Sequence, residues 1–405
     1  MPKYDVAFIG AGISGLYAAA LLAKAGKKVI VVDPAEKAGG AAAERFIDRF
    51  RFIAGPNIGY GFETGSTAEA FFTSLGLSPD QYPAASRFQV ALPDRRITVS
   101  PNVQETLDEL RREFPREIDR LAWLYGDANR LALKAAKSAL SSYFLGHRSA
   151  DAYLRTCHFS RELTAYFDVQ SRFFFGQSIR NVPLASLVLL LTTPPRSFPG
   201  GLGPISDRML SVLGEHQCDV HLREPWPELI FRRRHISSVR MPHGAIEPRS
   251  IVINTDWQPQ EHAMFIGLRE EVIPVGMAST VIYLPDYDKQ EDTVILALPH
   301  DRSSSGAPEG TIPLIVLGTS REKLREHSES IIPFLSDFIV MADEQDHQAR
   351  GFALPKEVTV SSPDPLSAVK LPVPNSIDNL HLLPDSSRAL HRSLQAGQRV
   401  ADKLR

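Results

Sequence analysis

The residues best suited to chemistry in this chain are three glycines in the pattern Gly10-x-Gly12-x-x-Gly15. In this spacing the first glycine permits a tight turn, the second lets backbone N–H groups approach a pyrophosphate, and the third allows a helix to pack closely. The intervening pair Ile13-Ser14 would begin a helix whose N-terminus attracts anions. The pattern therefore predicts that Gly10 to Gly15, including Ile13 and Ser14, bind the phosphates of a dinucleotide.

Asp33 is the next candidate binding residue. A carboxylate at this distance from the glycines can accept hydrogen bonds from ribose hydroxyls. It also disfavours a cofactor with a 2′-phosphate, because two anions would meet there. The glycines and Asp33 by themselves leave both NAD and FAD open.

Two strands and a helix must position these residues. Residues 5–9 and 28–32 read as strands, and an alanine- and leucine-rich helix runs between them to about Gly26. The order strand, glycine turn, helix, strand, acid is the context that the motif requires. It predicts an α/β fold with a Rossmann-type dinucleotide-binding domain.

Later segments resemble the flavin-dependent amine oxidase superfamily, and within it the phytoene desaturase and carotenoid isomerase branch. That family has a Gly-Gly pair after the second strand, here Gly39-Gly40, and then a Phe-x-x-x-Gly-Pro segment. Residues 50–56, with Phe50, Phe52 and Gly55-Pro56, are similar to this segment. Segments 87–99, 114–118, 198–205, 379–385 and 396–397 are similar to family segments in the same order. The resemblance thus extends along nearly the whole chain.

The resemblance implies FAD as the cofactor. It places Gly39, Gly40, Gly55 and Pro56 near the flavin or its pyrophosphate, and Pro227 near the adenine. Near the C-terminus it implies further cofactor contacts by Asp385, Leu390, His391 and Arg392. It also implies a Rossmann-type FAD-binding domain from 1–75, 198–260 and 351–405, with an interleaved α+β substrate domain from 76–197 and 261–350.

Four positions depart from the family pattern. Ala41 replaces the arginine that usually follows the Gly-Gly pair, and Pro384 replaces the glycine before Asp385. His391 and Arg392 stand where the family has small residues beside the flavin pyrimidine. Such cations would either stabilise a reduced, anionic flavin or fill the space that the flavin needs.

The resemblance, together with these departures, leaves three functions open. The first is an FAD-dependent oxidoreductase acting on an apolar, polyene or lipid-like substrate. The second is a flavin amine oxidase, and the third is a family member without redox chemistry that serves as a binding or scaffold protein. We find no constellation of catalytic side chains, which suits the first reading because a flavin itself transfers hydride or electrons.

Aromatic and leucine-rich segments suggest where an apolar substrate would bind. The run from Tyr166 to Phe175 is rich in aromatic residues, and Leu187 to Leu191 is a short apolar run. Such residues either line an apolar cavity or form the ordinary core.

Composition excludes several other classes of protein. The net charge of −2 gives no reason to expect binding to nucleic acid. The two cysteines, Cys157 and Cys218, form no disulfide framework, and with no targeting segment before the first strand they indicate a cytoplasmic protein. The histidines lack metal-ligand spacing, so no metal site is expected.

The sequence predicts no spanning helix, because the longest apolar run is far shorter than the ~20 residues that a bilayer requires. The basic run from Arg232 to His235 reads as a solvated hairpin tip, with peripheral membrane contact left open. Oligomeric state and electron acceptor have no signal in the sequence.

Local patterns predict several further elements. Asn102 should cap a helix that runs to Glu113, and another helical pattern covers 117–140. A third helix is expected from Glu322 to about Met341.

Overall fold

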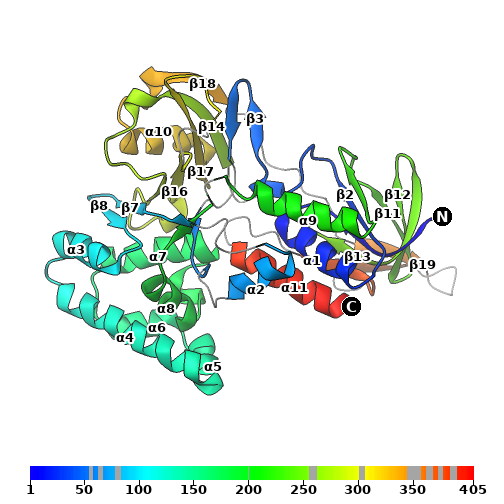
Figure 1. The fold of residues 1–405 in the computed structure, drawn as a ribbon, viewed down its shortest axis with the longest axis horizontal. Coiled ribbons are helices and arrows are strands. Elements are labelled where there is room, and N and C mark those ends of the chain that lie inside the picture. Colours follow the sequence, from blue (N-terminus) through cyan, green and yellow to red (C-terminus); the bar gives the residue numbers. More distant parts are fainter. Residues whose placement is uncertain are drawn as a thin grey trace.

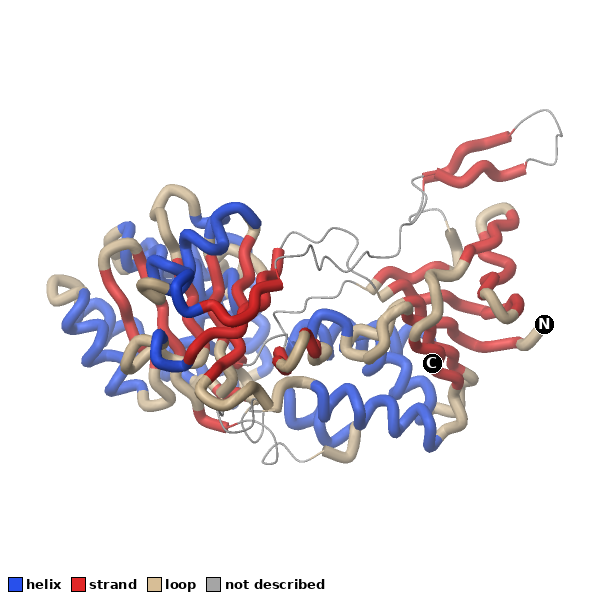
Figure 2. The backbone as a smooth tube through the Cα atoms, turned by 90° about the horizontal axis from the view of Figure 1, so that it is seen from above, coloured by secondary structure: helices blue, strands red, loops and turns tan. Residues whose placement is uncertain are grey.

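The computed structural model describes residues 1–53, 58–62, 67–77, 84–198, 200–254, 262–300, 306–343, 357–361, 368–372, 377–383 and 390–405. Two large sheets lie in separate halves of the molecule (Figure 2). The predicted positions Gly55, Pro56, Pro384 and Asp385 lie outside the described residues. For Ala41, Leu390, His391 and Arg392 the structure describes the backbone alone.

The first sheet contains the predicted strand–turn–helix–strand unit. Its order is β10-β2-β1-β13-β12-β11, and β21 also pairs with β13. Strands β10, β2, β1, β13 and β21 are parallel, whereas β12 runs antiparallel to both β13 and β11. The strands are β1 (Lys3–Ile9), β2 (Val29–Asp33), β10 (Asp219–Leu222), β11 (Glu228–Arg232), β12 (His235–Met241), β13 (Gly244–Ile253) and β21 (Leu380–Leu382).

Both faces of the first sheet are covered, as its nearly continuous apolar strands require. Val6 and Phe8 of β1 pack against helices on one face. Ala7 and Ile9 point to the other face, where side chains of β11, β12 and β13 cover them. The helices are α1 (Ile13–Lys24), α2 (Thr67–Ser74), α9 (Gly203–Glu215) and α11 (Leu390–Leu404), of which α1, α9 and α11 lie together in Figure 1.

The second sheet has the order β18-β14-β17-β16-β15-β7-β8 and is antiparallel except for the β15–β7 pair. The segment 87–99, which resembles a segment of the family, contains the β7–β8 hairpin of this sheet. The strands are β7 (Phe88–Leu92), β8 (Arg95–Val99), β14 (His262–Arg269), β15 (Thr280–Tyr283), β16 (Val294–Ala297), β17 (Thr311–Gly318) and β18 (Ile339–Asp343).

A group of helices packs beside the second sheet and forms the lower left part of the molecule in Figure 1. These helices are α3 (Val103–Glu113), α4 (Ile118–Lys137), α5 (Ala139–His147), α6 (Ala150–Arg155), α7 (Arg161–Phe175) and α8 (Leu184–Thr192), while α10 (Arg321–Ile331) packs on the sheet itself. Asn102 caps α3 as predicted, since its side chain accepts a hydrogen bond from the Gln104 N–H.

The prediction of a helix from Glu322 to Met341 is wrong in its second half. Helix α10 ends at Ile331, and β18 begins at Ile339. Pro333 follows the helix, and Phe334 has a φ of +64°. A proline cannot donate the helical hydrogen bond, and a left-handed residue ends the helix.

Four small pairings complete the fold. The hairpin β3 (Arg45–Ile47) and β4 (Phe50–Phe52) reaches from the first half to the second sheet (Figure 1). Strand β9 (Arg196–Ser197) pairs with β5 (Ile58–Gly59) and β6 (Ala84–Ala85), and β19 (Glu357–Ser361) pairs with β20 (Ala368–Pro372). No helix in the described part of the chain is long and apolar enough to cross a membrane.

Candidate functional site

The glycine turn between β1 and α1 meets the second glycine segment directly. Gly10 has a φ of +101° and donates its N–H to the Val32 carbonyl, which turns the chain away from the sheet. Gly39 donates its N–H to the Ala11 carbonyl over 2.7 Å, and Gly12 and Gly39 form a parallel bridge. Two strips of nearly bare backbone therefore lie side by side at the start of α1, which suits the close approach of a pyrophosphate.

Gly39 and Gly40 both require glycine-like backbone conformations. Their φ angles are +116° and +60°, respectively. A Cβ atom added to Gly39 would also lie 3.0 Å from the hydroxyl of Ser206 in α9. The second glycine segment is therefore held between α1 and α9 in a conformation that other residues rarely adopt.

Asp33 ends β2 and organises the turn. One carboxylate oxygen accepts the Ala11 N–H over 2.6 Å, and the other accepts the Ala35 N–H over 2.7 Å. The side chain is buried, and this burial raises the pKa of Asp33 although both hydrogen bonds oppose the rise. A carboxylate has about four lone-pair sites, so acceptor capacity remains for a ligand hydroxyl.

Ser14 lies in the first turn of α1 and has an unusual side chain. It is fully buried, and its hydroxyl has no hydrogen-bond partner among the described residues. Buried polar groups are nearly always paired, so an orphan hydroxyl requires an explanation. A phosphate oxygen at the N-terminus of α1 would satisfy it and would also interact with the helix dipole. The residues present therefore fit a dinucleotide.

Asn254 is a site residue that the sequence analysis missed. It follows β13 directly, and its side-chain oxygen accepts the Gly15 N–H over 3.0 Å. A Cβ atom added to Gly15 would lie 2.8 Å from two carbon atoms of Asn254. Gly15 thus permits close packing, as predicted, and the side chain packed against it is that of Asn254.

Helix α11 packs beside α1 (Figure 1), and Gly397 of α11 lies against the first turn of α1. A Cβ atom added to Gly397 would lie only 2.5 Å from the Ser14 carbonyl oxygen. The predicted residues Leu390, His391 and Arg392 form the first turn of α11. Pro227 is buried just before β11, three residues after Glu224, whose N–H donates to the Asp33 carbonyl.

The aromatic residues expected near a substrate are packed as core. Tyr166, Phe167, Phe173, Phe174 and Phe175 are all buried in one cluster with strand β7 and helices α4 and α8. None of them lines a cavity that is present in the second half of the molecule.

That cavity has a volume of about 560 Å³ and lies at one end of the second sheet. Its most notable group is His300, whose Nδ1 lies 3.5 Å from the Ser86 hydroxyl and 3.3 Å from the Ser279 hydroxyl. Arg87, Asn102, Glu105, Met277, Leu298 and Pro299 are among its other lining residues. The lining is mixed, with an apolar part and several hydrogen-bonding groups.

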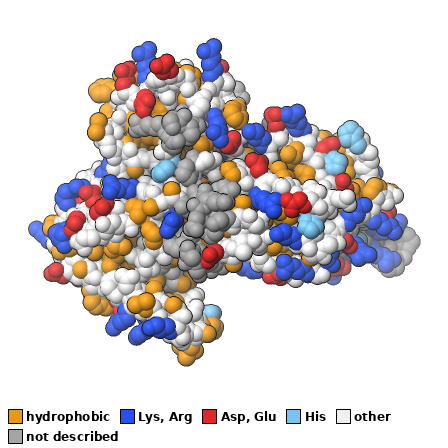
Figure 3. Space-filling model, in the orientation of Figure 1, with side chains coloured by type: hydrophobic (Ala, Val, Ile, Leu, Met, Phe, Trp, Pro, Cys, Tyr) orange, Lys and Arg blue, Asp and Glu red, His pale blue; other side chains and the backbone are white. Residues whose placement is uncertain are grey.

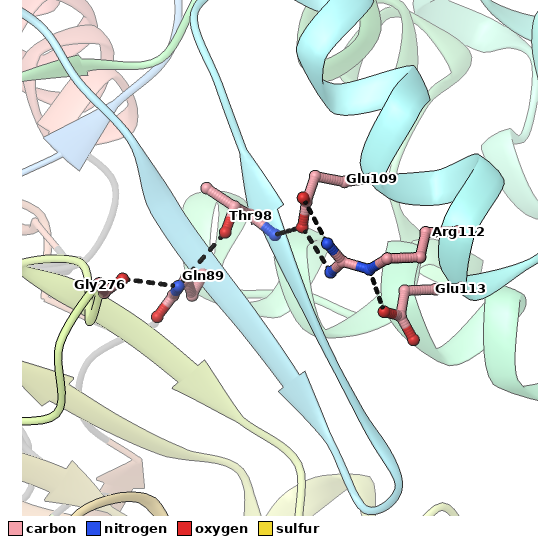
Figure 4. A network of polar contacts seen from close by, with 6 residues as sticks. All are labelled: Gln89, Thr98, Glu109, Arg112, Glu113 and Gly276. Atoms are coloured by element: carbon pink, nitrogen blue, oxygen red, sulfur yellow. Dashed lines mark hydrogen bonds and ion pairs between the residues drawn. The ribbon is translucent and has the colours of Figure 1, made fainter.

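A partly buried network of hydrogen bonds holds one wall of this cavity, and Figure 4 shows most of its residues. The Gln89 side chain in β7 donates to Thr98 and to the Gly276 carbonyl, and its oxygen accepts the Ala278 N–H. Thr98 in turn donates its N–H to Glu109 of α3. Since residues 277–279 line the cavity, this network fixes them relative to the sheet.

The described residues contain no group of three or more side chains that would hold a metal ion. Cys157 and Cys218 are free thiols, and burial raises the pKa of both. Neither has the lowered pKa of a reactive cysteine.

Comparisons with known proteins agree with this geometry. A family model for an NAD(P)-binding Rossmann-like domain matches residues 9–75. Prolycopene isomerase from Daucus carota is 22% identical over 78% of this chain and 62% of its own length. Carotenoid 3,4-desaturase from Haloarcula japonica is 23% identical over 77% of this chain and 75% of its own length. Flavin-containing amine oxidase B from Homo sapiens is 22% identical over 62% of this chain and 50% of its own length.

Solved structures share the fold over nearly the whole chain. An oxidoreductase from Methanosarcina mazei has a TM-score of 0.63 at 12% identity and covers 99% of this chain and 100% of its own. The Rab GDI from Plasmodium falciparum has a TM-score of 0.67 at 12% identity and covers 100% of this chain and 98% of its own. Together with the relatives, they confirm a Rossmann-type domain with an interleaved α+β part, and the resemblance seen in the motifs. The chain spans about 62% of the length of the carrot isomerase.

Proposed function

We propose that this chain, which resembles the phytoene desaturase and carotenoid isomerase branch of the flavin-dependent amine oxidase superfamily, is an FAD-dependent oxidoreductase that acts on an apolar substrate. The observation that carries the proposal is the start of α1. There a buried hydroxyl without a hydrogen-bond partner among the described residues, two glycine segments lying side by side and a helix N-terminus converge beside Asp33.

The residues have separate roles in this proposal. Gly10, Gly12, Ile13, Ser14 and Gly15 would bind the pyrophosphate together with Gly39 and Gly40, and Asp33 would accept from the ribose. Pro227 would lie near the adenine, while Gly55, Pro56, Asp385, Leu390, His391 and Arg392 would surround the flavin half. When bound, the flavin would supply the electron-transfer chemistry. The protein would bind and orient the substrate and would exclude water from it.

We extend the proposal to organisation and substrate. Residues 1–75, 198–260 and 351–405 would form the FAD-binding domain, and 76–197 with 261–350 the substrate domain. The carotenoid-related names of two relatives support an apolar, polyene or lipid-like substrate. The two free thiols support a reducing, cytoplasmic location.

The first experiment is an absorption spectrum of the purified protein after incubation with FAD. Bound oxidised flavin gives bands near ~370 and ~450 nm, and mass spectrometry of the released cofactor distinguishes FAD from other flavins. The variant Gly12→Val should lose these bands, because its side chain would block the pyrophosphate. Gly12 has a φ of −70°, so the substitution does not strain the backbone.

Gly214→Ala is the matched control. Gly214 lies in α9, and no atom of a described residue lies within 4 Å of the Cβ position. This variant should bind flavin like the original chain. Flavin retained by Gly12→Val would contradict the cofactor site, and a native protein that binds no flavin would support the non-catalytic reading.

A second experiment separates the two redox readings. The flavin-loaded protein is mixed anaerobically with a polyene or with a primary amine, and substrate loss is followed by chromatography. We expect loss of the polyene. Loss of the amine without loss of the polyene would favour the amine oxidase reading.

A further inference from the structure

Helix α5 and the end of α4 expose large apolar side chains. Leu133, Leu140, Tyr143 and Phe144 are exposed by 64%, 65%, 58% and 55%, respectively. Within the nine residues of α5, Leu145 alone is buried. A surface helix of a soluble domain normally buries its apolar side chains, so the exposure of these four needs a reason.

The same segment carries positive charge without negative charge. From residue 128 to residue 150 the chain has Arg130, Lys134, Lys137 and Arg148 but no aspartate or glutamate. Arg130 pairs with Asp127, whereas Lys134, Lys137 and Arg148 form no ion pair with any carboxylate in the described ranges. We call Leu133, Leu140, Tyr143 and Phe144, together with these three unpaired cations, the α5 tip.

The α5 tip lies at an extremity of the molecule. In Figure 1 helix α5 is at the lower end, far from the first sheet and from the start of α1. On the face seen in Figure 3, orange apolar side chains gather at this end among blue and pale-blue basic ones, and no red acidic side chain is visible there. In Figure 1 no described helix or strand extends beyond α5 at this end, so the tip can meet a flat surface.

We propose that the α5 tip docks this protein on the surface of an anionic lipid bilayer. Exposed leucine and aromatic side chains next to unpaired lysine and arginine fit both the acyl boundary and the charged headgroups. Tyrosine suits the interface because its ring is apolar and its hydroxyl is polar. A second copy of the chain fits less well, since a symmetric contact would bring the same cations face to face.

Docking does not require the flavin, so it is tested separately from the proposed function. The full chain is sedimented with vesicles of phosphatidylcholine alone, and with vesicles of equal parts phosphatidylcholine and phosphatidylglycerol. We expect binding to the mixed vesicles and little binding to the neutral ones. The triple variant Lys134→Gln, Lys137→Gln, Arg148→Gln should bind the mixed vesicles roughly 100-fold more weakly, at about fivefold per cation.

The double variant Tyr143→Ser, Phe144→Ser tests the apolar side chains of the α5 tip. It should bind the mixed vesicles at least about tenfold more weakly than the original chain. Both side chains are exposed, so the fold should persist, and circular dichroism checks this. Two variants serve as matched controls and should bind fully. Arg232→Gln, Arg233→Gln, Arg234→Gln removes three exposed cations elsewhere, and Val275→Ser, Phe334→Ser removes two apolar side chains that are at least as exposed.

Three results would overturn the proposal. The first is absence of binding to the mixed vesicles, and the second is equal weakening by the control variants. The third is a concentration-dependent dimer in analytical ultracentrifugation that the Tyr143→Ser, Phe144→Ser variant abolishes, which would assign the α5 tip to a second copy.

Discussion

The buried hydroxyl of Ser14 allows ligand binding to be separated from stability at a single residue. Because it has no partner among the described residues, Ser14→Ala removes an unsatisfied group. The free energy of unfolding without nucleotide should stay unchanged or rise by up to about 1 kcal/mol. Nucleotide affinity should fall about tenfold, as expected for losing a hydrogen bond to a charged group.

Denaturant unfolding and cofactor titration measure these two effects. Ser328→Ala is the matched control, because the buried Ser328 hydroxyl donates to the Leu324 carbonyl and lies in α10. It should leave nucleotide affinity unchanged, because α10 lies on the second sheet. A loss of stability in Ser14→Ala would mean that the hydroxyl has a structural partner.

Asp33 should make stability depend on pH in a defined direction. Burial raises its pKa above the ordinary value of 3.8, so in this range the folded protein binds more protons than the unfolded chain. Its contribution to stability is therefore fully present below pH 3.8 and decreases as pH rises through the folded pKa.

Asp33→Asn removes this titration and leaves one of the two N–H donors, Ala11 or Ala35, without its acceptor. We expect a cost of about 1–3 kcal/mol that becomes smaller as pH rises. Urea unfolding at a series of pH values measures it. A cost that grows with pH would show that the hydrogen bonds outweigh burial at this carboxylate.

At the scale of elements, the packing of α11 on α1 depends on Gly397. A Cβ atom there would lie 2.5 Å from the Ser14 carbonyl oxygen, which is backbone and moves only with α1. Gly397→Ala should therefore lower the free energy of unfolding by about 1–3 kcal/mol. It should also weaken nucleotide binding by displacing the first turn of α1.

Gly214→Ala in α9 again provides the contrast. A Cβ atom there would contact none of the residues that the structure describes, so alanine should stabilise the helix by about 0.5–1 kcal/mol. Thermal unfolding of both variants gives the comparison. Equal behaviour would show that the close contact between α11 and α1 relaxes without cost.

Features that depend on residues close to one another in the sequence were predictable. The glycine turn, the cap at Asn102 and the hairpin tip at Arg233, which has a φ of +56°, all follow local rules. Pro333 also gave a local signal for the end of α10, but the helical pattern on both sides of it concealed the break.

Contacts set by the order of strands were not predictable. Asn254 meets Gly15 across 239 positions in sequence, because β13 joins the sheet next to β1. His300 lacked metal-ligand spacing and gave no signal of its own. Its serine neighbours come from segments 214 and 21 positions away, and the sheet alone brings them together.

At the scale of the whole molecule, two separate cores meet through the β3–β4 hairpin. The hairpin leaves the first half after the Gly39-Gly40 segment and places Phe50 and Phe52 on the second sheet. Gly267 of β14 makes room for it, since a Cβ there would lie 2.3 Å from the Phe50 ring. The hairpin therefore couples the half that holds the glycine turn to the half that holds the cavity.

This coupling predicts how the molecule unfolds when the hairpin is weakened. Phe52 is fully buried, and its ring lies 5.2 Å from that of Phe265 in an edge-on contact. Phe52→Ala should cost about 3–5 kcal/mol. It should also split a single calorimetric transition into two, because each sheet keeps its own core. Adding Gly397→Ala should then move only the transition that belongs to the first sheet.

Phe167→Ala is the control, because it removes the same side chain and leaves a void of similar size. Phe167 is equally buried but belongs to α7 and lies in another hydrophobic cluster than the hairpin. It should cost a similar free energy and leave one transition. A single transition in Phe52→Ala, at a lower temperature, would mean that the two halves are joined mainly by contacts other than this hairpin.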